Sequence, residues 1–573
     1  MVKISWLLTI INMTNINPKK QILIVYIVLI LVTFAVFWQV NQFDFVYDDI
    51  VYVTGNSHIQ SGITLDGLRW AFSTTYAEFW HPLTWLSLMF DYQLHGLNAG
   101  AYHLTNLVLH ILSTLLLFWL FNRMTGAIWK SAFVAAFFAL HPLHVESVAW
   151  IAERKDVLSA FWGMLTLCLY VYYTEKPIIR RYLLVLFGFV CALMSKSMVI
   201  TLPVIMILLD YWPLSRFRIG IESKKDKLFL WQLKEKLPFF ILSAVFVIIT
   251  IYAHNKQHSK IYPLSYRLTN APVAFVTYLG KTFLPHDMAI FYPFSEHLPL
   301  WQVLGATLLI IIISVVVIVM MKRQSYLFVG WLWYAITILP VIGIIQIGDF
   351  AMADRYIYLP SIGISIMLAW GIPLLFPNEN ISKKVLFPVG IAAIVILAIL
   401  TWQQCGYWKN SITLFRHALQ VTKDNYVAHI NLGLALFPEG KVEEAIYHYN
   451  RAINIAPDYS GAYNNRGGAY MILGQYQHAI EDYNETIRLK PDLASAYYNR
   501  GFVYSTLGKY QRAVEDYNEA IRLQPYYALF YNNRGAAYLK QGNKEQGCRD
   551  AQKACAWGDC DAIKWAKGQG YCR

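Results

Sequence analysis

The stretch A-Y-N-N-R-G-G-A-Y at residues 462–470 returns as A-Y-Y-N-R-G-F-V-Y at residues 496–504, and it decides the fold of the C-terminal third. The interval is 34 residues, and glycines, tyrosines and prolines recur at the same interval: Gly433, Gly467, Gly501 and Gly535; Tyr449, Tyr483 and Tyr517; Pro457, Pro491 and Pro525. A fixed period of this length indicates a structural unit that repeats, with neighbouring units stacked to bury a shared apolar face.

A 34-residue period with small residues and a closing proline is the tetratricopeptide repeat (TPR) signature, in which each unit is a pair of helices. The sequence predicts four units at 426–459, 460–493, 494–527 and 528–561, after a linker or helix at 403–425 and before a C-terminal cap at 562–573. Asparagines that recur in register are candidates for the concave groove, where their amides can bind an extended peptide backbone: Asn464, Asn465, Asn499, Asn532 and Asn533.

Residues 21–402 have a different character, because long apolar runs recur through them. In the whole chain 57% of residues are hydrophobic and 14% are charged, and the mean hydropathy is +0.39. About 20 apolar residues in a helix cross the hydrocarbon core of a bilayer. The sequence therefore predicts an all-α chain whose membrane domain has about 11 spans, at approximately 21–40, 102–121, 131–149, 156–174, 182–198, 199–212, 237–253, 301–321, 326–347, 357–376 and 385–402.

The distribution of positive charge predicts the orientation of these spans. Lys19 and Lys20 precede the first apolar run, and no small-residue cleavage site follows it, so residues 1–20 are expected to be a cytoplasmic N-terminus before a retained anchor. With an odd number of spans, the predicted inner segments hold most of the Lys and Arg residues, as the positive-inside rule requires. The net charge of +13 is explained by these loops, and nucleic acid is not expected as a partner.

The same threading places the large loops and the TPR array on one side of the membrane. Segment 271–284 contains Pro272 and is interpreted as a re-entrant or interfacial helix, since counting it as a span would reverse the charge bias. The loops 41–101 and 254–300 are then both on the outer face, together with everything after residue 402.

Cysteine usage agrees with an oxidising compartment for the C-terminus. Four cysteines fall in the last part of the chain, and they can pair in three ways: Cys548, Cys555, Cys560 and Cys572. Free thiols or a metal site are the alternatives, but this segment has no histidine and no C-x-x-C pair, so two disulfides are favoured.

Ionisable residues at span ends converge on the predicted outer face. The loop F-D-F-V-Y-D-D-I at 43–50 contains Asp48 and Asp49, and the third span ends in H-P-L-H-V-E-S-V-A-W-I-A-E-R-K-D at 141–156. Lys196 lies in S-K-S between two apolar runs, and Arg355 lies in A-D-R-Y-I-Y-L-P. Charged groups at membrane depth are expensive to bury and are functional candidates by default. A carboxylate can accept a proton from an attacking hydroxyl, and Lys or Arg can neutralise a departing lipid phosphate.

Simpler interpretations exist for each of these residues. A pair of acids in a loop is usually only solvated, Arg154 and Asp156 could pair with each other, and His141 before a proline fits a structural role. The run H-x-x-H-x-E matches no established metal-ligand spacing, so no metal site is assigned from it.

Several long motifs, in order, resemble the transmembrane-and-TPR-containing protein O-mannosyltransferases of the C-type glycosyltransferase (GT-C) superfamily. These motifs are F-V-Y-D-D, H-P-L-T-W-L-S, L-H-G-L-N-A-G-A-Y-H-L-T-N-L-V-L-H, the 141–156 run, S-K-S-M-V-I-T-L-P and A-D-R-Y-I-Y-L-P-S-I-G. The resemblance covers nearly the whole chain, and it departs from the family at His81, where a basic residue is expected, and at E-R-K-D, where the usual pattern is G-R-x-[DE].

The resemblance implies a GT-C fold with its active site at the outer face and a polyprenyl-phosphate sugar as donor. It implies that Asp48 or Asp49 is the catalytic base, a choice that the sequence leaves open. It also implies a set of residues that line the donor phosphate or the acceptor: His144, Glu146, Arg154, Asp156, Lys196 and Arg355. A divalent cation is left open as a cofactor.

The sequence therefore predicts an integral-membrane glycosyltransferase that moves a mannose-like hexose to a polypeptide or other acceptor held by the TPR groove. The short array of four repeats and the cysteine-rich tail indicate a bacterial chain, so the expected location is the inner membrane, with the TPR array in the periplasm. The alternative is a non-catalytic membrane scaffold whose TPRs assemble envelope proteins. A transporter ranks last, because few charged residues lie deep inside the predicted spans.

Overall fold

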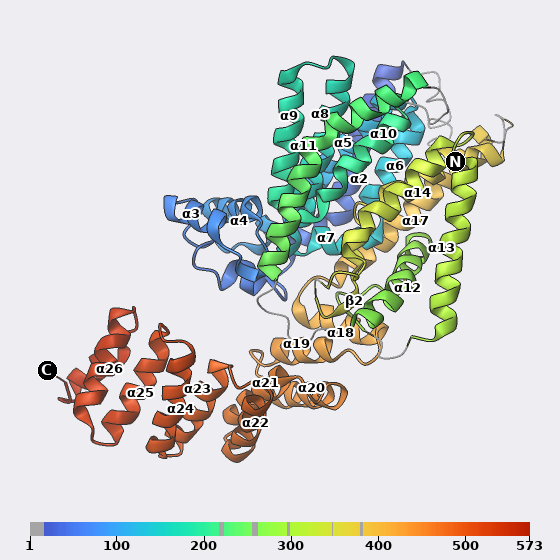
Figure 1. The fold of residues 1–573 in the computed structure, drawn as a ribbon. Helices are drawn as coiled ribbons and strands as arrows, with labels where there is room; N and C mark the ends of the chain where they lie inside the picture. Colours follow the sequence, from blue (N-terminus) through green and yellow to red (C-terminus); the bar gives the residue numbers. More distant parts are fainter. Residues whose placement is uncertain are drawn as a thin grey trace, which may run out of the picture. The chain divides into compact units, whose positions relative to one another are not determined.

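In the computed structural model the chain forms two compact units, Met1–His417 and Ala418–Arg573 (Figure 1). The structure describes residues 17–216, 223–254, 262–294, 298–346, 348–376, 378 and 382–572. Most of the predicted cytoplasmic N-terminus, residues 1–16, and residues 255–261 and 295–297 of the predicted loop 254–300 lie outside the described residues.

The N-terminal unit is almost entirely helical. Its α-helices are α2 (Pro18–Phe37), α3 (Leu65–Ser73), α4 (Pro82–His95), α5 (Ala99–Thr125), α6 (Ile128–Leu140), α7 (Val145–Ala149), α8 (Arg154–Glu175), α9 (Ile179–Ser195), α10 (Leu202–Tyr211), α11 (Ser223–His254), α12 (Leu264–Phe283), α13 (Leu300–Met320), α14 (Ser325–Ile338), α15 (Ser361–Gly371) and α17 (Phe387–Gly406). Helix α18 (Ser411–Val421) follows, and short turns include η3 (Ile50–Thr54), η6 (Ile151–Glu153) and η9 (Asp354–Ile357).

Within the described residues, six helices are long and apolar enough to cross a membrane, and a bent pair would make a seventh. The six are Pro18–Gln42, Ala99–Thr125, Ile151–Glu175, Gln232–Ala253, Leu300–Met320 and Lys384–Gly406, and the bent pair is Ile128–Leu140 with Pro142–Ala149, at 53°. The protein is thus a multi-pass membrane protein. Other predicted spans fall on shorter apolar helices, such as Ser197–Tyr211 and Ser325–Val341, so the count of eleven stays a prediction.

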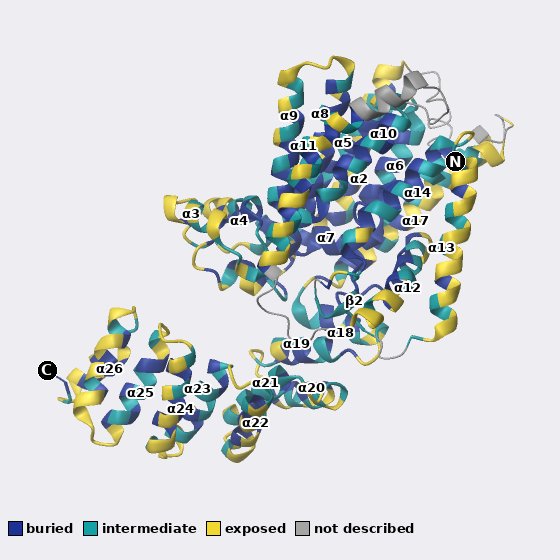
Figure 2. Ribbon diagram, in the orientation of Figure 1, coloured by how far each residue is buried: buried dark blue, intermediate teal, exposed yellow. Residues whose placement is uncertain are grey.

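Burial separates the lipid-facing helices from the core of the bundle (Figure 2). Helix α13 exposes large apolar side chains along its length, among them Leu304 at 59% and Val319 at 77%. Such a surface is stable against lipid, because exposure of this much apolar area to water is unfavourable in free energy. By contrast, every residue from 137 to 160 is buried.

The buried segment 137–160 is a bent crossing that brings polar side chains into the bundle. Pro142 cannot continue helix α6, and the His141 ring accepts the Leu143 backbone N–H at 3.2 Å. Asn106 of α5 then donates to the carbonyls of Val148 at 3.2 Å and Trp150 at 3.0 Å. The freed backbone groups are therefore satisfied inside the protein, as they must be away from water.

A two-stranded antiparallel ladder ties a loop of the predicted outer face to the turn that carries Arg355. Strand β1 (Tyr292–Pro293) pairs with β2 (Phe350–Met352). The ladder brings residues 284–294 next to η9.

The C-terminal unit is the predicted array of helix pairs: α19 (Tyr426–Leu436) with α20 (Val442–Ile455), α21 (Ser460–Ile472) with α22 (Tyr476–Leu489), α23 (Ala494–Thr506) with α24 (Tyr510–Leu523), and α25 (Ala528–Lys540) with α26 (Lys544–Ala556), closed by α27 (Asp561–Gly568). The periodic glycines and tyrosines have a steric cause. A Cβ on Gly467 would lie 2.9 Å from the Tyr483 ring, and one on Gly433 would lie 2.5 Å from Tyr449. The predicted helical fold with a C-terminal TPR array is confirmed, with the short β1–β2 ladder as an addition.

A ladder of arginines, which the sequence interpretation missed, joins successive repeats. Arg500 binds both oxygens of Asp516 in its own repeat, at 2.9 and 2.6 Å, and the Asn484 amide oxygen of the preceding repeat at 2.6 Å. The same triad recurs as Arg466 with Asp482 and Asn450, and as Arg534 with Asp550 and Asn518. The 34-residue period of these residues was a signal available in the sequence.

The C-terminal cap is covalently closed. Cys548 is joined to Cys572 and Cys555 to Cys560, which is one of the three pairings open from the sequence. Residues of the cap, among them Ala562 and Ile563, form a buried cluster with Leu539 of α25. The final helix thus covers the apolar end of the array, as terminal repeats require.

The arginine ladder predicts a local loss of stability. Replacing Arg500 by Ala leaves Asp516, which is largely buried, without its charged partner, so the array should lose about 1–3 kcal/mol around α22 to α24. Hydrogen–deuterium exchange of the full chain should speed up in these helices. Arg522→Ala, which removes an exposed pair with Glu519, should change exchange little, and equal effects of the two variants would contradict the role of the ladder.

Candidate functional site

A cluster of charged side chains lies where four separate segments of the membrane unit meet. The segments are α7, η6 with the start of α8, the break between α9 and α10, and η9. Glu146, Glu153, Asp156, Lys196 and Arg355, all but Glu153 predicted as site residues, are brought together there. They lie in short helical turns, at a helix start or between helices, so their side chains converge from several directions.

Glu153 is the centre of this cluster. Its Oε1 lies 3.2 Å from Lys155 Nζ and 3.1 Å from Arg355 Nε, and its Oε2 lies 3.3 Å from Lys196 Nζ. The Glu153 side chain is 2% exposed. Three cations around one carboxylate offset the cost of burying its negative charge.

Two of the three cations have a second carboxylate of their own. Arg355 pairs with Glu146 through its guanidinium and also donates its backbone N–H to Glu146 Oε2 at 2.9 Å. Lys196 pairs with Asp156, whose other oxygen accepts the Ser147 hydroxyl at 3.1 Å. The predicted residues Glu146 and Asp156 therefore hold cations in place.

Lys155 differs from the other two cations. Apart from Glu153, the groups that its ammonium contacts among the described residues are neutral: the Tyr52 hydroxyl at 3.3 Å, the Ala152 carbonyl at 3.1 Å, and the faces of Tyr52 and Phe79 at 4.7 and 5.4 Å. Ring faces attract cations weakly. Within the described residues, Lys155 thus has one ion-pair partner, whereas Lys196 and Arg355 have two each.

The structure separates the roles of the two loop acids. Asp49 is fully buried, and its oxygens accept the backbone N–H groups of Val46 at 2.9 Å and Ala152 at 2.7 Å. Asp49 therefore fastens the loop to the start of the α8 region. Such a contact fixes the position of its neighbour along the chain, Asp48.

Asp48 is half-buried, and no side chain or backbone group among the described residues forms a hydrogen bond or ion pair with its carboxylate. Burial raises the pKa of Asp48 to about 6, while the positive charges of Lys155 and Arg355 oppose the rise. A carboxylate with free oxygens and a pKa near the working pH has the properties of a general base.

His81, where the family resemblance leads us to expect a basic residue, is buried and neutral. Burial lowers its pKa well below the usual value, and Lys155 and Lys196 lower it further. Its ring lies parallel to Tyr52 at 5.9 Å and against Trp85 at 4.6 Å. Within the described residues Nε2 of His81 has no hydrogen-bond partner. Lys155, instead of residue 81, supplies the positive charge at this place.

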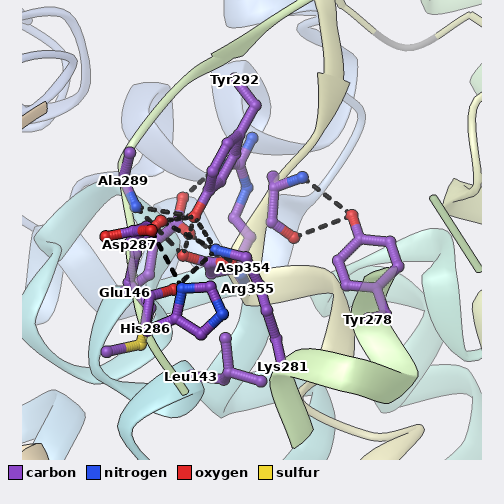
Figure 3. A network of polar contacts seen from close by, with 12 residues as sticks. Leu143, Glu146, Tyr278, Lys281, His286, Asp287, Ala289, Tyr292, Asp354 and Arg355 are labelled. Atoms are coloured by element: carbon purple, nitrogen blue, oxygen red, sulfur yellow. Dashed lines mark hydrogen bonds and ion pairs between the residues drawn. The ribbon is translucent and has the colours of Figure 1, made fainter. Parts of the chain in front are cut away.

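A second polar network adjoins Arg355 and was not predicted (Figure 3). Asp354 accepts the Tyr292 hydroxyl at 2.6 Å and lies 3.7 Å from Lys281 Nζ, which itself donates to the Asp287 carbonyl at 2.8 Å. The Tyr278 hydroxyl accepts the Ala353 N–H at 2.8 Å. These contacts fix η9 and so the direction of Arg355. Lys281, Asp287 and Tyr292 belong to no recognisable motif, so their part in the network could not be predicted.

Arg154 and His144 are placed apart from the cation cluster by their own bonds. Arg154 is fully buried and binds Asp91 Oδ2 at 2.7 Å, Ser87 Oγ at 2.7 Å and the Tyr102 carbonyl at 2.8 Å, as well as Asn106. His144 contacts the Phe138 carbonyl at 2.6 Å and Ser361 Oγ at 3.1 Å. Both residues therefore brace the bundle, and we leave them out of the site proposed below.

A small hollow lies near Arg355, whose guanidinium faces the rings of Phe350 at 5.2 Å and Tyr356 at 5.1 Å. Phe350 and Tyr356 also line the hollow, with mostly apolar neighbours such as Phe294 and Val341. The surroundings of Arg355 on this side are therefore mostly apolar.

In the TPR unit, several predicted groove asparagines are used inside the array. Asn499 donates to Asn464 Oδ1 at 3.2 Å, Asn532 accepts the Ala562 N–H at 2.9 Å, and Asn533 donates to the Tyr498 hydroxyl at 3.1 Å. Their binding of a peptide, like that of Asn465, stays a prediction. In the described parts of the chain, no three His, Cys, Asp or Glu side chains are placed to hold a metal ion together.

Fold and site define the class: a multi-pass membrane protein with a buried charge cluster and a TPR array. A family model described as "TPR repeat" matches residues 435–474 and 467–508, and a second, described as "Tetratricopeptide repeat", matches 494–527. A crystal structure of MamA is 25% identical, with a TM-score of 0.25, and covers 26% of this chain and 89% of that one.

The curated homologues are protein O-mannosyl-transferases of the TMTC family. The human TMTC1 protein is 24% identical over 477 residues, 71% of this chain and 52% of its own length. The Caenorhabditis elegans protein F38B6.6 is 24% identical over 430 residues (71% and 59%), and human TMTC4 is 24% identical over 469 residues (71% and 63%). The chain spans about half to three-fifths of the length of these relatives.

The different bonding of Asp48 and Asp49 predicts different mutant phenotypes. Asp49→Ala leaves two buried backbone N–H groups without an acceptor, each at a cost of about 1–3 kcal/mol. The midpoint of thermal unfolding of the detergent-solubilised chain should therefore fall clearly. Asp48→Ala should leave the midpoint close to that of the wild type. Similar losses in both variants would contradict the assignment of Asp49 to loop anchoring.

Proposed function

We propose that this protein is an integral-membrane glycosyltransferase that moves a hexose, mannose by analogy with its homologues, from a polyprenyl-phosphate carrier to a hydroxyl acceptor. The observation that carries the proposal is the position of Asp48, a half-buried acid with free oxygens, within the field of Lys155 and Arg355. An unbonded base beside a cation cluster provides both groups that such a transfer needs.

In the proposed reaction, the acceptor hydroxyl attacks the anomeric carbon of the sugar as Asp48 takes its proton. The bond between the anomeric carbon and the phosphate oxygen breaks, and its electron pair stays on the phosphate. The products are the glycosylated acceptor and the lipid monophosphate, and the proton on Asp48 returns to solvent. Lys155, Lys196 and Arg355 would stabilise the negative charge that develops on the phosphate.

The donor's lipid chain explains why the site would lie in a membrane protein. A polyprenyl chain stays in the bilayer, so the enzyme must meet its phosphate head near the membrane surface. The aromatic residues beside Arg355, Phe350 and Tyr356, support this class of donor, because they place apolar surface next to a cation. A GT-C fold is expected by the resemblance, and a divalent cation is left open as a cofactor to which we assign no residue.

The end of the last long apolar helix supports a shared outer face for Asp48 and for the chain that leads to the repeats. The Asp44 N–H donates to the Lys409 carbonyl at 3.0 Å, and the Tyr47 ring packs edge-on against Phe415 at 5.5 Å. Residues that follow α17 thus lie beside the acidic loop. With the disulfides of the cap, this favours a periplasmic array on a bacterial inner-membrane protein.

The TPR array would bind the acceptor polypeptide. Repeats of this kind present a concave surface along which an extended peptide can lie. Binding there would raise the local concentration of acceptor hydroxyls around the membrane unit. The alternative function, a scaffold for envelope proteins, uses the same array without Asp48, and the first experiment below separates the two.

Replacing the base should remove transfer and leave the protein intact. For Asp48→Asn we expect a loss of about 10²–10⁴-fold in transfer of radiolabelled mannose from polyprenyl-phosphate mannose to peptides, the usual contribution of a general base. The matched control is Asp66→Asn, an acid of the same loop whose side chain is 91% exposed, and it should keep full activity. Full activity of Asp48→Asn would overturn the assigned base, and no transfer by the wild type would favour the scaffold.

The pH dependence should report the same carboxylate. Because Asp48 must be ionised to accept a proton and its pKa is raised to about 6, kcat/KM should fall about tenfold per pH unit below about pH 6 and level off above about pH 7. The measurement is transfer rate from pH 5 to 8, with full recovery after a return from pH 5 to exclude unfolding. A flat profile over this range would contradict Asp48 as the base.

A further inference from the structure

We propose that the Glu153 carboxylate is an internal stand-in for the phosphate of the lipid-linked donor: it occupies the cation cluster when no donor is bound, exchanges with the donor's phosphate, and returns to expel the lipid monophosphate. The inference rests on the proposed function, since it assigns the phosphate of that donor to the same cations.

The contacts of Glu153 are those expected of a bound phosphate. Its two oxygens contact Lys155, Lys196 and Arg355 at 3.1–3.3 Å. Glu153 directly precedes α8, but its side chain makes no capping hydrogen bond to that helix, so its carboxylate is not needed there. All three cations are nearly buried, with side-chain exposures of 7, 9 and 10%. A phosphate can therefore reach them only by taking the place of a group already there.

Among the ion pairs of the cluster, one cation depends on Glu153 alone. Arg355 is paired with Glu146 and Lys196 with Asp156, which leaves Lys155 as the cation without an ion pair among the described residues when Glu153 is withdrawn; the Asp48 carboxylate lies in its field but forms no ion pair with it. A sugar linked through phosphate to a lipid is a phosphodiester with one negative charge. It can replace Glu153 without changing the net charge of the site, so the exchange avoids burying an unpaired charge.

The product does not fit the same balance. After transfer, the lipid phosphate is a monoester with a charge of about −1.5 to −2 at pH 7, more than Lys155 can compensate. Return of Glu153 restores the net charge that the site has without donor, and it releases the product. Glu153 thus favours binding of the diester donor over the monoester product at the cation cluster. It positions the cations and is not a catalytic residue.

The test is a binding measurement on the full chain in detergent. Farnesyl monophosphate serves as a short-chain lipid monoester, farnesol as the same chain without phosphate, and inorganic phosphate as the free anion. For Glu153→Gln, which keeps the shape and removes the charge, we expect farnesyl monophosphate to bind about 10-fold more tightly, with farnesol unchanged. In sugar transfer, kcat should fall and product inhibition should strengthen.

Glu153→Gln leaves Lys155 without its ion pair, which could itself prevent folding. Two further variants control for this effect. The double variant Glu153→Gln/Lys155→Met removes the cation with the anion, and we expect it to fold and to lose the gain in phosphate affinity. Glu153→Asp keeps the charge but is one methylene shorter, so it cannot reach all three cations and should give a smaller gain, about 2–3-fold, in the same direction.

Unchanged binding of farnesyl monophosphate in both Glu153→Gln and Glu153→Asp would overturn the inference, and so would an equal gain for farnesol or a gain that persists in the double variant. A gain for inorganic phosphate alone would overturn the assignment to a lipid headgroup. These results are independent of the transfer assay: absence of sugar transfer in the wild type would end the proposed function, whereas the binding series decides the role of Glu153.

Discussion

The constraint on which the membrane unit depends is the cost of placing charges where water cannot reach them. Glu153 meets that constraint by sharing its two oxygens among three cations, and Arg154, the next residue, meets it with contacts to α4 and α5. Neighbouring residues of one turn therefore point to two different networks. One network fastens the helices together, and the other gathers charge beside Asp48. The bent crossing at 137–160 is what allows both, because a continuous helix could not direct these side chains apart.

The sequence was sufficient for the architecture and for the neighbourhood of the site. The 34-residue period predicts the TPR array, and the apolar runs predict the membrane domain. The choice between Asp48 and Asp49 could not be made, because it depends on the backbone N–H of Ala152, far away along the chain. Arg154 and Arg355 also look alike in the sequence, each beside an acid, and only the surrounding partners distinguish a brace from a site residue. The number of spans is equally hidden, since hydropathy alone does not reveal where a run bends or stops short.

Some features were within reach of sequence reasoning and were missed. His103, Asn106 and His110 recur at helical spacing in the apolar run of α5, which indicates a polar face toward a buried partner. The arginine of each N-R-G motif and the aspartate 16 residues later share the TPR period, so the ladder follows from the repeat itself. The first repeat lacks it: Leu432 and His448 stand at the corresponding positions, and His448 contacts His429 instead.

The contacts of the segment after α17 have a mechanical consequence. Helix α17 ends at Gly406, and within a few residues the chain contacts the loop that carries Asp48, through Lys409, Ser411 and Phe415. These hydrogen bonds and the ring contact link the segment that leads to the repeats directly to that loop. A force transmitted along this segment would therefore act on Tyr47, one peptide bond from Asp48.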